Sequence, residues 1–389
     1  MFKSVLVIMT LLLTISGEGI QYEVSFFGEG LGPVEEISLC ADEYSLYLAY
    51  IPPDSSDTVV VKLSPELQEL GSVCIENFAS PCIKVYNKRI YLAGIRDEQI
   101  IVQVLSDDLK FLDDFTMEVE EPVDVYILPG KEGILLSYAH RFLEDNLLRQ
   151  DVFLKKVDFS FQEEAATRLT SWEYWEDPSL AVYGDTILLC YANAPLVSFL
   201  DRHVVITTLN WDLETLGEVR YPAAVSEDVP KRNVVQPEIT ALDDGVLLLF
   251  RVTDRDFSFT QLTWEGVATM IPGNIGGLPV SDELTMGDEI AITSDTQEQY
   301  QPAAVSAFGK IYFAYAVSEK EVKNLHIICA DTVDELKVEP PPWWQNQMYQ
   351  IAGIALVIGI GVVILGIMKR SRFKKKKKEK EKGKKKSRK

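Results

Sequence analysis

Histidine, cysteine and recognisable catalytic motifs are all scarce in this chain of 389 residues. It has three histidines, His140, His203 and His326, and their wide separation disfavours a histidine-based metal centre or a Ser-His-Asp triad. No Gly-x-Ser-x-Gly elbow, His-Glu-x-x-His motif or calcium-loop pattern occurs. We therefore expect no metal site and no cofactor, and we assign no catalytic residue.

Five cysteines are too few for a disulfide-dense mini-domain, and outside the cytoplasm an odd number leaves at least one thiol unpaired. Cys74 and Cys82 bracket a loop, and we predict a disulfide between them. Cys190 and Cys329 lie within apolar stretches and are predicted to be core residues. No Asn-x-Ser/Thr sequence is present, so N-glycosylation has no acceptor.

Positive charge is scarce except at the C-terminus. The formal net charge is −21, but residues 369–389 alone carry +13, which leaves −34 on the first 368 residues. Such an acidic body excludes a strongly basic nucleic-acid binder, and it suits a cationic partner or a salty medium. We do not expect nucleic acid as a partner, with RNA bound by the basic end as the alternative.

The first apolar segment predicts a secretory signal peptide over residues 1–19. Lys3 precedes an uncharged apolar run over residues 5–15, and small residues follow it. A helix of about eleven residues spans about 16 Å, which is too short for a hydrocarbon core of about 30 Å. An uncleaved membrane anchor is the alternative.

The second apolar segment, residues 348–368, contains no charged residue and is long enough to cross a bilayer as a helix. Lys369 and Arg370 follow at once, so the positive-inside rule places the C-terminus in the cytoplasm. We predict a single-pass type I protein of the cell membrane. Its ectodomain would comprise residues 20–337, and residues 338–347 would form a Pro-rich linker.

The basic tail, residues 369–389, cannot bury a core and is predicted to be disordered and to contact anionic lipid. The membrane-surface residues are expected to be Lys369, Arg370, Arg372, Lys374, Lys375 and Lys376. Mostly small residues recur on one stripe of the preceding helix, at Ala352, Ala355, Gly359, Val362 and Gly366. This stripe predicts helix pairing in a homodimer or a larger membrane assembly.

A repeat dominates the predicted ectodomain. Six times a proline opens a strand, a tight turn and a second strand, and successive prolines are 41 to 65 residues apart. These prolines are Pro33, Pro81, Pro122, Pro178, Pro237 and Pro302. The second strands are expected within residues 44–50, 89–94, 133–138, 185–191, 245–250 and 309–315, and third strands within residues 59–63, 100–105, 152–157, 204–209, 259–264 and 325–329.

This period and strand pattern resemble those of six-bladed β-propellers, whose blades have four strands. The resemblance covers nearly the whole ectodomain but rests on no family signature. The expected fold class is therefore all-β, a six-bladed β-propeller followed by one C-terminal transmembrane α-helix. The segment Tyr22–Phe27 is expected to close the ring by pairing with the last blade. The alternative is two stacked β-sandwiches.

One face of the ring should collect the residues that precede first strands and follow second strands, because these strands run antiparallel. This face is the predicted ligand-binding face. Its residues are Arg96, Glu121, His140, Asp177, Asn193, Gln236, Glu238, Arg251 and Gln301. Two apparent insertions flank it, Arg141–Gln150 and Ile271–Tyr300, and the run Pro272–Gly277 suggests a flexible loop without the spacing of a phosphate-binding loop.

These observations predict a membrane-anchored recognition or scaffold module for a protein or glycan ligand. The alternative is a membrane-tethered, glycosidase-like enzyme using carboxylates on the same face. Sialidases share the expected architecture, although their Ser-x-Asp-x-Gly-x-x-Trp repeats are absent. Two carboxyl groups about 5 to 10 Å apart in a deep pocket beside Arg96 or Arg251 would favour the enzyme. A shallow rim would favour binding, and a third interpretation is a membrane assembly subunit.

Overall fold

The computed structural model describes residues 21–27, 35–144, 147–170, 175–193, 203–221, 232–242, 245–254, 274–281, 284–293, 298–319 and 322–336. These lie in the first of two compact units, Met1–Val338. Within the described segments, no helix has the length and apolar character needed to cross a bilayer. The predicted signal peptide, linker, transmembrane helix and basic tail lie outside these segments and stay predictions.

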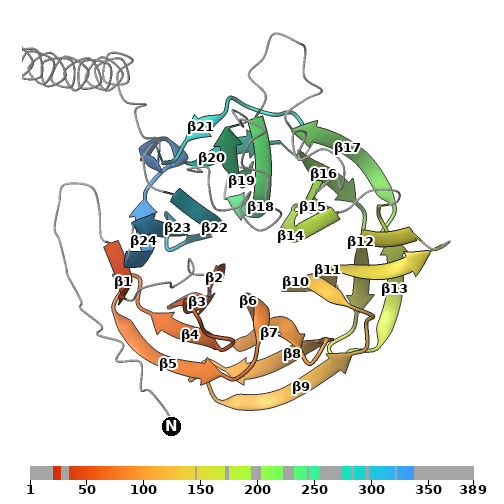
Figure 1. Ribbon diagram of the computed structural model, residues 1–389, viewed down its shortest axis with the longest axis horizontal. Helices are drawn as coiled ribbons and strands as arrows, with labels where there is room; N and C mark the ends of the chain where they lie inside the picture. Colours follow the sequence, from red (N-terminus) through yellow and green to blue (C-terminus); the bar gives the residue numbers. More distant parts are fainter. Residues whose placement is uncertain are drawn as a thin grey trace, which may run out of the picture. The chain divides into compact units, whose positions relative to one another are not determined.

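Six four-stranded antiparallel sheets, here called blades I to VI, surround a central axis (Figure 1). Blade I is β2 (Glu35–Ala41), β3 (Leu46–Ile51), β4 (Thr58–Leu63) and β5 (Glu69–Ile75). Blade II is β6 (Ala79–Tyr86), β7 (Arg89–Arg96), β8 (Gln99–Ser106) and β9 (Phe111–Met117). Blade III is β10 (Pro122–Gly130), β11 (Gly133–Glu144), β12 (Leu147–Val157) and β13 (Glu163–Arg168).

The remaining blades follow the same order from the axis outward. Blade IV is β14 (Trp175–Tyr183), β15 (Thr186–Asn193), β16 (Val204–Leu209) and β17 (Thr215–Tyr221). Blade V is β18 (Arg232–Leu242), β19 (Gly245–Asp254), β20 (Asn274–Val280) and β21 (Ile290–Ala291). Blade VI is β22 (Glu298–Ala307), β23 (Lys310–Glu319), β24 (Val322–Ala330) and β1 (Gln21–Phe27), and a 3₁₀ turn, η2 (Val333–Leu336), follows it.

The ring closes through its first strand. β1 pairs antiparallel with β24 from Gln21 opposite Ile328 to Phe27 opposite Val322. The last blade therefore contains three strands from the end of the propeller and one from its beginning. The predicted all-β six-bladed propeller and its closing strand are confirmed, and the alternative of two stacked sandwiches is wrong.

The repeat pattern located most strands, but it failed in blade V. Its third strand was expected at residues 259–264, which lie outside the described segments, whereas the strand that pairs with β19 is β20, Asn274–Val280. The apparent insertion Ile271–Tyr300 therefore contains β20, β21 and the start of β22. The other apparent insertion is the paired end of a hairpin, with Arg141 opposite Gln150.

The glycines of β20 serve close packing rather than loop flexibility. A Cβ atom on Gly276 would lie 2.7 Å from the ring of Phe250, and one on Gly277 would lie 2.9 Å from Ile292. Both distances are shorter than a normal carbon contact, so a larger residue at either position would have to displace these buried side chains.

The core lies between neighbouring blades. All residues of β3 and β16 are buried, and the largest cluster joins apolar side chains of blades II, III and IV. The outermost strands β13 and β17 instead alternate between exposed and half-buried residues, as expected for strands with one face in water. Blade stacking therefore buries the apolar inner strands and leaves polar edges outside.

No disulfide joins Cys74 to Cys82, so that prediction is wrong. None of the five cysteines forms a disulfide, and Cys74 is exposed whereas Cys82 is buried. The Cys82 thiol accepts a hydrogen bond from the backbone N–H of Ile127 at 3.4 Å, across the interface between blades II and III. Cys190 is buried, as predicted, and Cys329 is half-buried against the core of blades I and VI.

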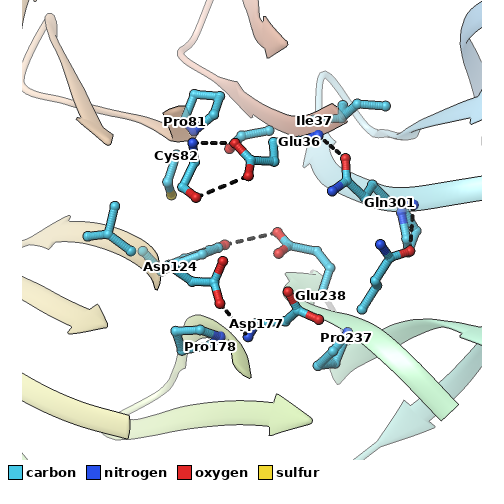
Figure 2. Close-up of a pocket in the computed structure, with 16 residues that line it drawn as sticks. Glu36, Ile37, Pro81, Cys82, Asp124, Asp177, Pro178, Pro237, Glu238 and Gln301 are labelled. Carbon is cyan, nitrogen blue, oxygen red and sulfur yellow. Dashed lines mark hydrogen bonds between the residues drawn. The ribbon is translucent and has the colours of Figure 1, made fainter. Parts of the chain in front are cut away.

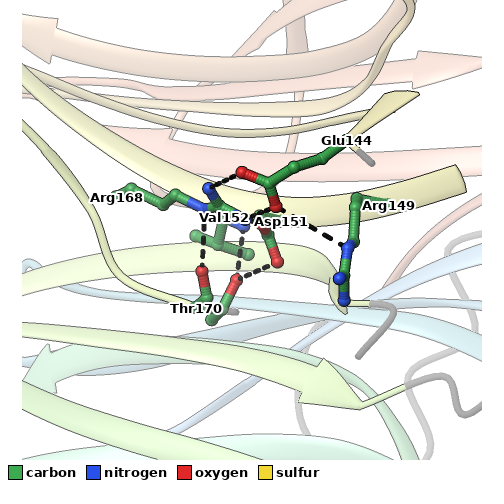
Figure 3. Close-up of polar contacts among 6 residues, drawn as sticks. All are labelled: Glu144, Arg149, Asp151, Val152, Arg168 and Thr170. Carbon is green, nitrogen blue, oxygen red and sulfur yellow. Dashed lines mark hydrogen bonds and ion pairs between the residues drawn. The ribbon is translucent and has the colours of Figure 1, made fainter. Parts of the chain in front are cut away.

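An ion-pair network joins the three outer strands of blade III (Figure 3). The Arg168 guanidinium donates to both carboxylate oxygens of Glu144 at 3.1 Å and, through Nε, to Asp151 Oδ2 at 2.7 Å. The Asp151 side chain is fully buried and also accepts from the Thr170 hydroxyl at 3.2 Å. Arg149 adds an ion pair with Glu144 at 3.7 Å. This network ties the long β11–β12 hairpin to β13.

Candidate functional site

A β-bulge interrupts the innermost strand of every blade near its start. In blade IV, for example, Glu176 pairs with Ala192 and Ser179 pairs with Cys190, so Asp177 and Pro178 leave the ladder. Prolines occupy the bulge in four blades, where their missing N–H group removes a ladder hydrogen bond. The residue before each of these prolines has a positive φ of 47° to 52°, at Ser80, Asp177, Gln236 and Gln301. The bulges therefore redirect short segments of the inner strands.

The bulge segments line one cavity of about 110 Å³ at the axis, here called the axial cavity (Figure 2). Each blade contributes one polar residue at its mouth, namely Glu36, Ser80, Asp124, Asp177, Gln236 and Gln301, which we call the axial ring. Pockets for drug-sized ligands typically measure about 300–1,000 Å³, and a liquid water molecule takes about 30 Å³. The cavity therefore has room for a chemical group rather than for a whole sugar ring.

Hydrogen bonds run from blade to blade around the axial ring. The Gln301 side chain accepts from the backbone N–H of Glu36, and the Glu36 carboxylate accepts from the backbone N–H of Ser80. The Ser80 hydroxyl lies 3.1 Å from Glu36 Oε1 and 3.2 Å from the Val123 carbonyl oxygen, to either of which it can donate. A side chain of one blade thus satisfies a backbone group of the next.

The same pattern continues on the other side of the ring. Asp124 Oδ2 accepts from the backbone N–H of Asp177 at 3.2 Å, and Gln236 Oε1 accepts from that of Gln301 at 3.3 Å. These bonds hold the ring side chains in fixed directions, so the cavity is preorganised.

A second polar cluster surrounds Glu238 of β18, which also lines the axial cavity and lies two residues further along the inner strand than Gln236. The Tyr126 hydroxyl donates to Glu238 Oε1 at 2.9 Å, and the Ser179 hydroxyl donates to Oε2 at 2.7 Å. The Lys84 ammonium is 3.9 Å from Oε1 and 4.6 Å from the centre of the Tyr126 ring. Burial raises the pKa of Glu238, opposed by Lys84 and the two hydroxyl donors. The pKa of Tyr126 is raised well above its usual value by burial and by Glu238, which disfavours a phenolate nucleophile.

Asp124 has the titration of most interest at the mouth. Burial raises its pKa to about 6, opposed by the hydrogen bond from the Asp177 N–H group, while Glu176 raises it further and Arg141 lowers it. The Asp124 carboxyl group therefore loses its proton near pH 6. An ordinary aspartate loses its proton near pH 4.

Four of the nine residues predicted for the binding face line the axial cavity, namely Asp177, Gln236, Glu238 and Gln301. The other five, Arg96, Glu121, His140, Asn193 and Arg251, do not line it. Glu121 is exposed, because the bulge of blade III lies at Val123 and places Asp124 in the ring instead.

The guanidinium and imidazole groups of this face pack against aromatic rings. Arg251 is buried 4.4 Å from the centre of the Tyr300 ring, and Arg96 lies 5.4 Å from that of Phe78. The His140 ring centre is 4.6 Å from that of Phe153, and the backbone N–H of Asn193 donates to the His203 carbonyl group at 2.8 Å. No arginine or lysine lines the axial cavity within the described segments.

Sequence reasoning missed Glu36, Ser80, Asp124 and Tyr126. The prediction took the residue before each repeat proline, and Glu36 was missed because Ile37 stands in place of that proline. In blade III the prediction used Pro122, so it selected Glu121 instead of Asp124. The second strands could have aligned the blades, because they share one pattern of apolar residues. Ala49, Ser137 and Leu249 occupy the same position in three of these strands, and their partners on the inner strands are Ser38, Tyr126 and Glu238, respectively. The residue two positions before each of these partners is the ring residue, namely Glu36, Asp124 or Gln236.

No protein-family model matches this chain, and no curated protein matches it in sequence. Solved structures with a similar arrangement include a subtype N10 neuraminidase-like protein of A/little yellow-shouldered bat/Guatemala, at 11% identity and a TM-score of 0.47, covering 80% of this chain and 98% of that one. A thermostable family-43 glycoside hydrolase matches at 12% identity and a TM-score of 0.44, covering 68% of this chain and 93% of that one. An endo-arabinase from Bacteroides thetaiotaomicron matches at 14% identity and a TM-score of 0.41, covering 68% and 95%. Likenesses this distant carry no argument about activity.

Proposed function

We propose that this protein is a membrane-anchored, extracytoplasmic recognition module whose axial cavity receives a positively charged group of a protein partner. The observation that carries the proposal is the convergence of three carboxyl groups, those of Glu36, Asp124 and Asp177, on a cavity that no cationic side chain lines within the described segments, whereas the fourth, Glu238, is already paired with Lys84. Partly desolvated carboxylates attract a cation more strongly than exposed ones do.

The size and walls of the cavity support the same function. A volume of about 110 Å³ suits the end of a lysine or arginine side chain. Four prolines line the cavity, Pro81, Pro178, Pro237 and Pro302, and they offer rigid apolar contacts for the methylene groups behind such a charge. The −34 charge of the first 368 residues would steer a basic partner toward this protein.

The proposed cellular location of this protein rests on its sequence alone. The signal-peptide pattern in residues 1–19 and the uncharged apolar segment 348–368 place the propeller outside the cell membrane in this proposal. The basic tail would contact anionic lipid on the cytoplasmic side, and the small-residue stripe would allow pairing of two membrane helices.

The test is binding of the full-length protein in nanodiscs to peptide and glycan arrays. We expect it to select peptides with lysine or arginine over the same peptides with norleucine or citrulline. The variant Asp124→Asn should weaken this binding roughly tenfold, the size of one lost charge-assisted contact. Asp114→Asn, which removes the same charge from the exposed strand β9, should not.

The pH dependence provides a second readout. Because the ionised form of Asp124 binds the cation and its pKa is about 6, affinity should rise as the pH increases from about 5 to 7. Equal binding of lysine and norleucine peptides, or an unchanged affinity in Asp124→Asn, would contradict the proposal.

A carbohydrate-active enzyme is the second function that we consider. The observation that favours it is the raised pKa of both Asp124 and Glu238 in one cavity, since a protonated carboxyl group is a general acid. Neither Arg96 nor Arg251 lines that cavity. Turnover of an aryl glycoside panel that is lost in Asp124→Asn would establish this function, and glycan binding without turnover would exclude it.

A further inference from the structure

A second cavity, of about 390 Å³, lies at the opposite end of the axis from the axial ring, and we call it the distal cavity. β10 contributes Asp124–Tyr126 to the axial cavity and then, further along the strand, Leu128–Gly130 to the distal cavity. β14 likewise supplies first Asp177 and Pro178 and then Leu180–Val182. Since a strand advances about 3.3 Å per residue, the two cavities open toward opposite faces of the propeller.

The distal cavity has apolar walls and a few polar groups. The aliphatic lining residues are Leu128, Pro129, Leu180, Ala181, Val182, Ile239 and Ala241. Trp211 closes one side, and its ring lies so near blade III that a Cβ atom on Gly130 would be 3.8 Å from Cη2. Exposed Lys131, Glu132 and Asp185 lie in the hairpin turns that frame this cavity. Its volume and composition are those of a small-molecule pocket.

Lys84 supplies the inner charge of the distal cavity. Its side chain is only 14% exposed, and its nearest anionic atom, Glu238 Oε1, lies 3.9 Å away, which is an ion pair but exceeds hydrogen-bond distance. Its other contact is the face of the Tyr126 ring at 4.6 Å. An ammonium has three N–H donors, so Lys84 can donate to a group bound in the cavity that it lines while it stays paired with Glu238.

We propose that the distal cavity binds a small organic carboxylate. The carboxylate oxygens would accept hydrogen bonds from Lys84, and the apolar body of the ligand would pack against Trp211 and the aliphatic wall. At the mouth the exposed Lys131 is offset by Glu132 and Asp185, so Lys84 is the charge that would select an acid. A phosphate dianion fits less well, because no arginine lines the cavity within the described segments and apolar walls cannot solvate a second charge. This site is independent of the function proposed for the axial cavity.

The test compares an acid with its neutral isostere on the full-length protein in detergent. Isothermal titration calorimetry with 4-phenylbutyrate and 4-phenylbutanamide should show the acid binding roughly tenfold more tightly, as one charge-assisted hydrogen bond provides. This comparison needs no variant. Equal affinity of acid and amide, or no saturable binding of the acid at millimolar concentration, would overturn the proposal.

Variants then locate the site. Lys84→Met alone would leave Glu238 buried without its cation, so the informative protein is the double variant Lys84→Met/Glu238→Gln, compared with Glu238→Gln alone. We expect the double variant to lose the tenfold preference for the acid and Glu238→Gln to keep it. Lys156→Met is the matched control, because Lys156 lies 5.9 Å from the centre of the Trp211 ring but does not line the cavity. An undiminished preference in the double variant would overturn the assignment to Lys84.

Discussion

Gly94 marks the one blade that departs from a shared packing rule. In five blades an aromatic residue of the second strand lies beside the bulge of the inner strand, namely Tyr50, Tyr138, Tyr191, Phe250 and Tyr315. Blade II has Gly94 at this position, and the buried ring of Phe78 occupies the space. A Cβ atom on Gly94 would lie 2.1 Å from Phe78 Cε1 and 2.7 Å from the Ala79 carbonyl oxygen.

We predict that Gly94→Ala lowers the free energy of unfolding by about 1–3 kcal/mol, because the new methyl group overlaps a buried ring and a backbone atom. Gly71→Ala is the control, since a Cβ atom there meets no atom within 4 Å, and it should be neutral or slightly stabilising. Denaturant unfolding of the two variants measures both effects. Equal stability of the two would show that Phe78 moves aside freely.

A single carboxyl group should also leave a pH signature on stability. The pKa of Asp124 is about 6 in the folded protein and about 3.9 in an unfolded chain, so the folded state binds the extra proton between these values. The free energy of unfolding should therefore fall as the pH rises from about 4 to 6, by about 1–3 kcal/mol.

Asp124→Asn should remove this fall and be the more stable protein at pH 7.5, because its amide oxygen still accepts the hydrogen bond from the Asp177 N–H group. Near pH 4 it should match the unmodified protein. Urea unfolding at the two pH values, with Asp114→Asn as the exposed control, measures the difference. A pH profile that is identical in the two variants would assign the effect to other carboxyl groups.

At the scale of the element, the β11–β12 hairpin of blade III depends on a buried charge. Arg168 on β13 neutralises Asp151, whose side chain is fully buried (Figure 3). We predict that Arg168→Met lowers the free energy of unfolding by about 3–5 kcal/mol, because it leaves the buried Asp151 carboxylate without its cationic partner. The double variant Arg168→Met/Asp151→Asn should recover much of the loss.

Lys155→Met offers a control on the same two strands. It breaks the Lys155–Glu163 ion pair, whose acid is about half exposed, and should cost at most about 1 kcal/mol. Thermal unfolding compares all three proteins. A similar small loss in Arg168→Met and Lys155→Met would mean that water reaches Asp151 in solution.

Sequence predicted the elements well where alternation and turn residues agreed. The expected strand 204–209 coincides with β16, and the closing strand was placed within one residue of β1. β20 was missed because Gly276, Gly277 and Pro279 lower its apparent strand propensity. Its glycines make sense only beside Phe250 and Ile292, which belong to other segments. The axial ring was half predicted for the same reason, since bulge position depends on pairing between strands.

At the scale of the whole molecule, two sets of contacts close the ring, one at its outer edge and one at its axis. At the periphery β1 completes blade VI, and at the axis the Gln301 side chain of blade VI accepts from the backbone N–H of Glu36 in blade I. Every other blade is made from one continuous segment, so its four strands form without help from the opposite end of the chain. The junction of blades VI and I therefore depends on the most distant contacts in sequence and pays the largest loop-closure entropy.

We predict that this junction is where the ring opens first. Proline at Val24 or at Ser25 tests the prediction, because successive amides of an antiparallel edge strand point alternately toward the partner strand and toward solvent. One of the two prolines must remove a hydrogen bond to β24, and the other should be tolerated. Leu112→Pro in β9, the outermost strand of a continuous blade, is the comparison.

Hydrogen-exchange mass spectrometry distinguishes the outcomes. The disruptive proline in β1 should speed exchange in β24 and also in β2 and β22, because the β1–β24 pairing that holds the two sides of the junction together is weakened. Leu112→Pro should speed exchange within blade II alone, because its neighbours retain their own contacts and the ring stays closed. Faster exchange confined to blade VI in the β1 variant would show that the hydrogen bond between Gln301 and Glu36, with the apolar packing around it, suffices to keep the propeller closed.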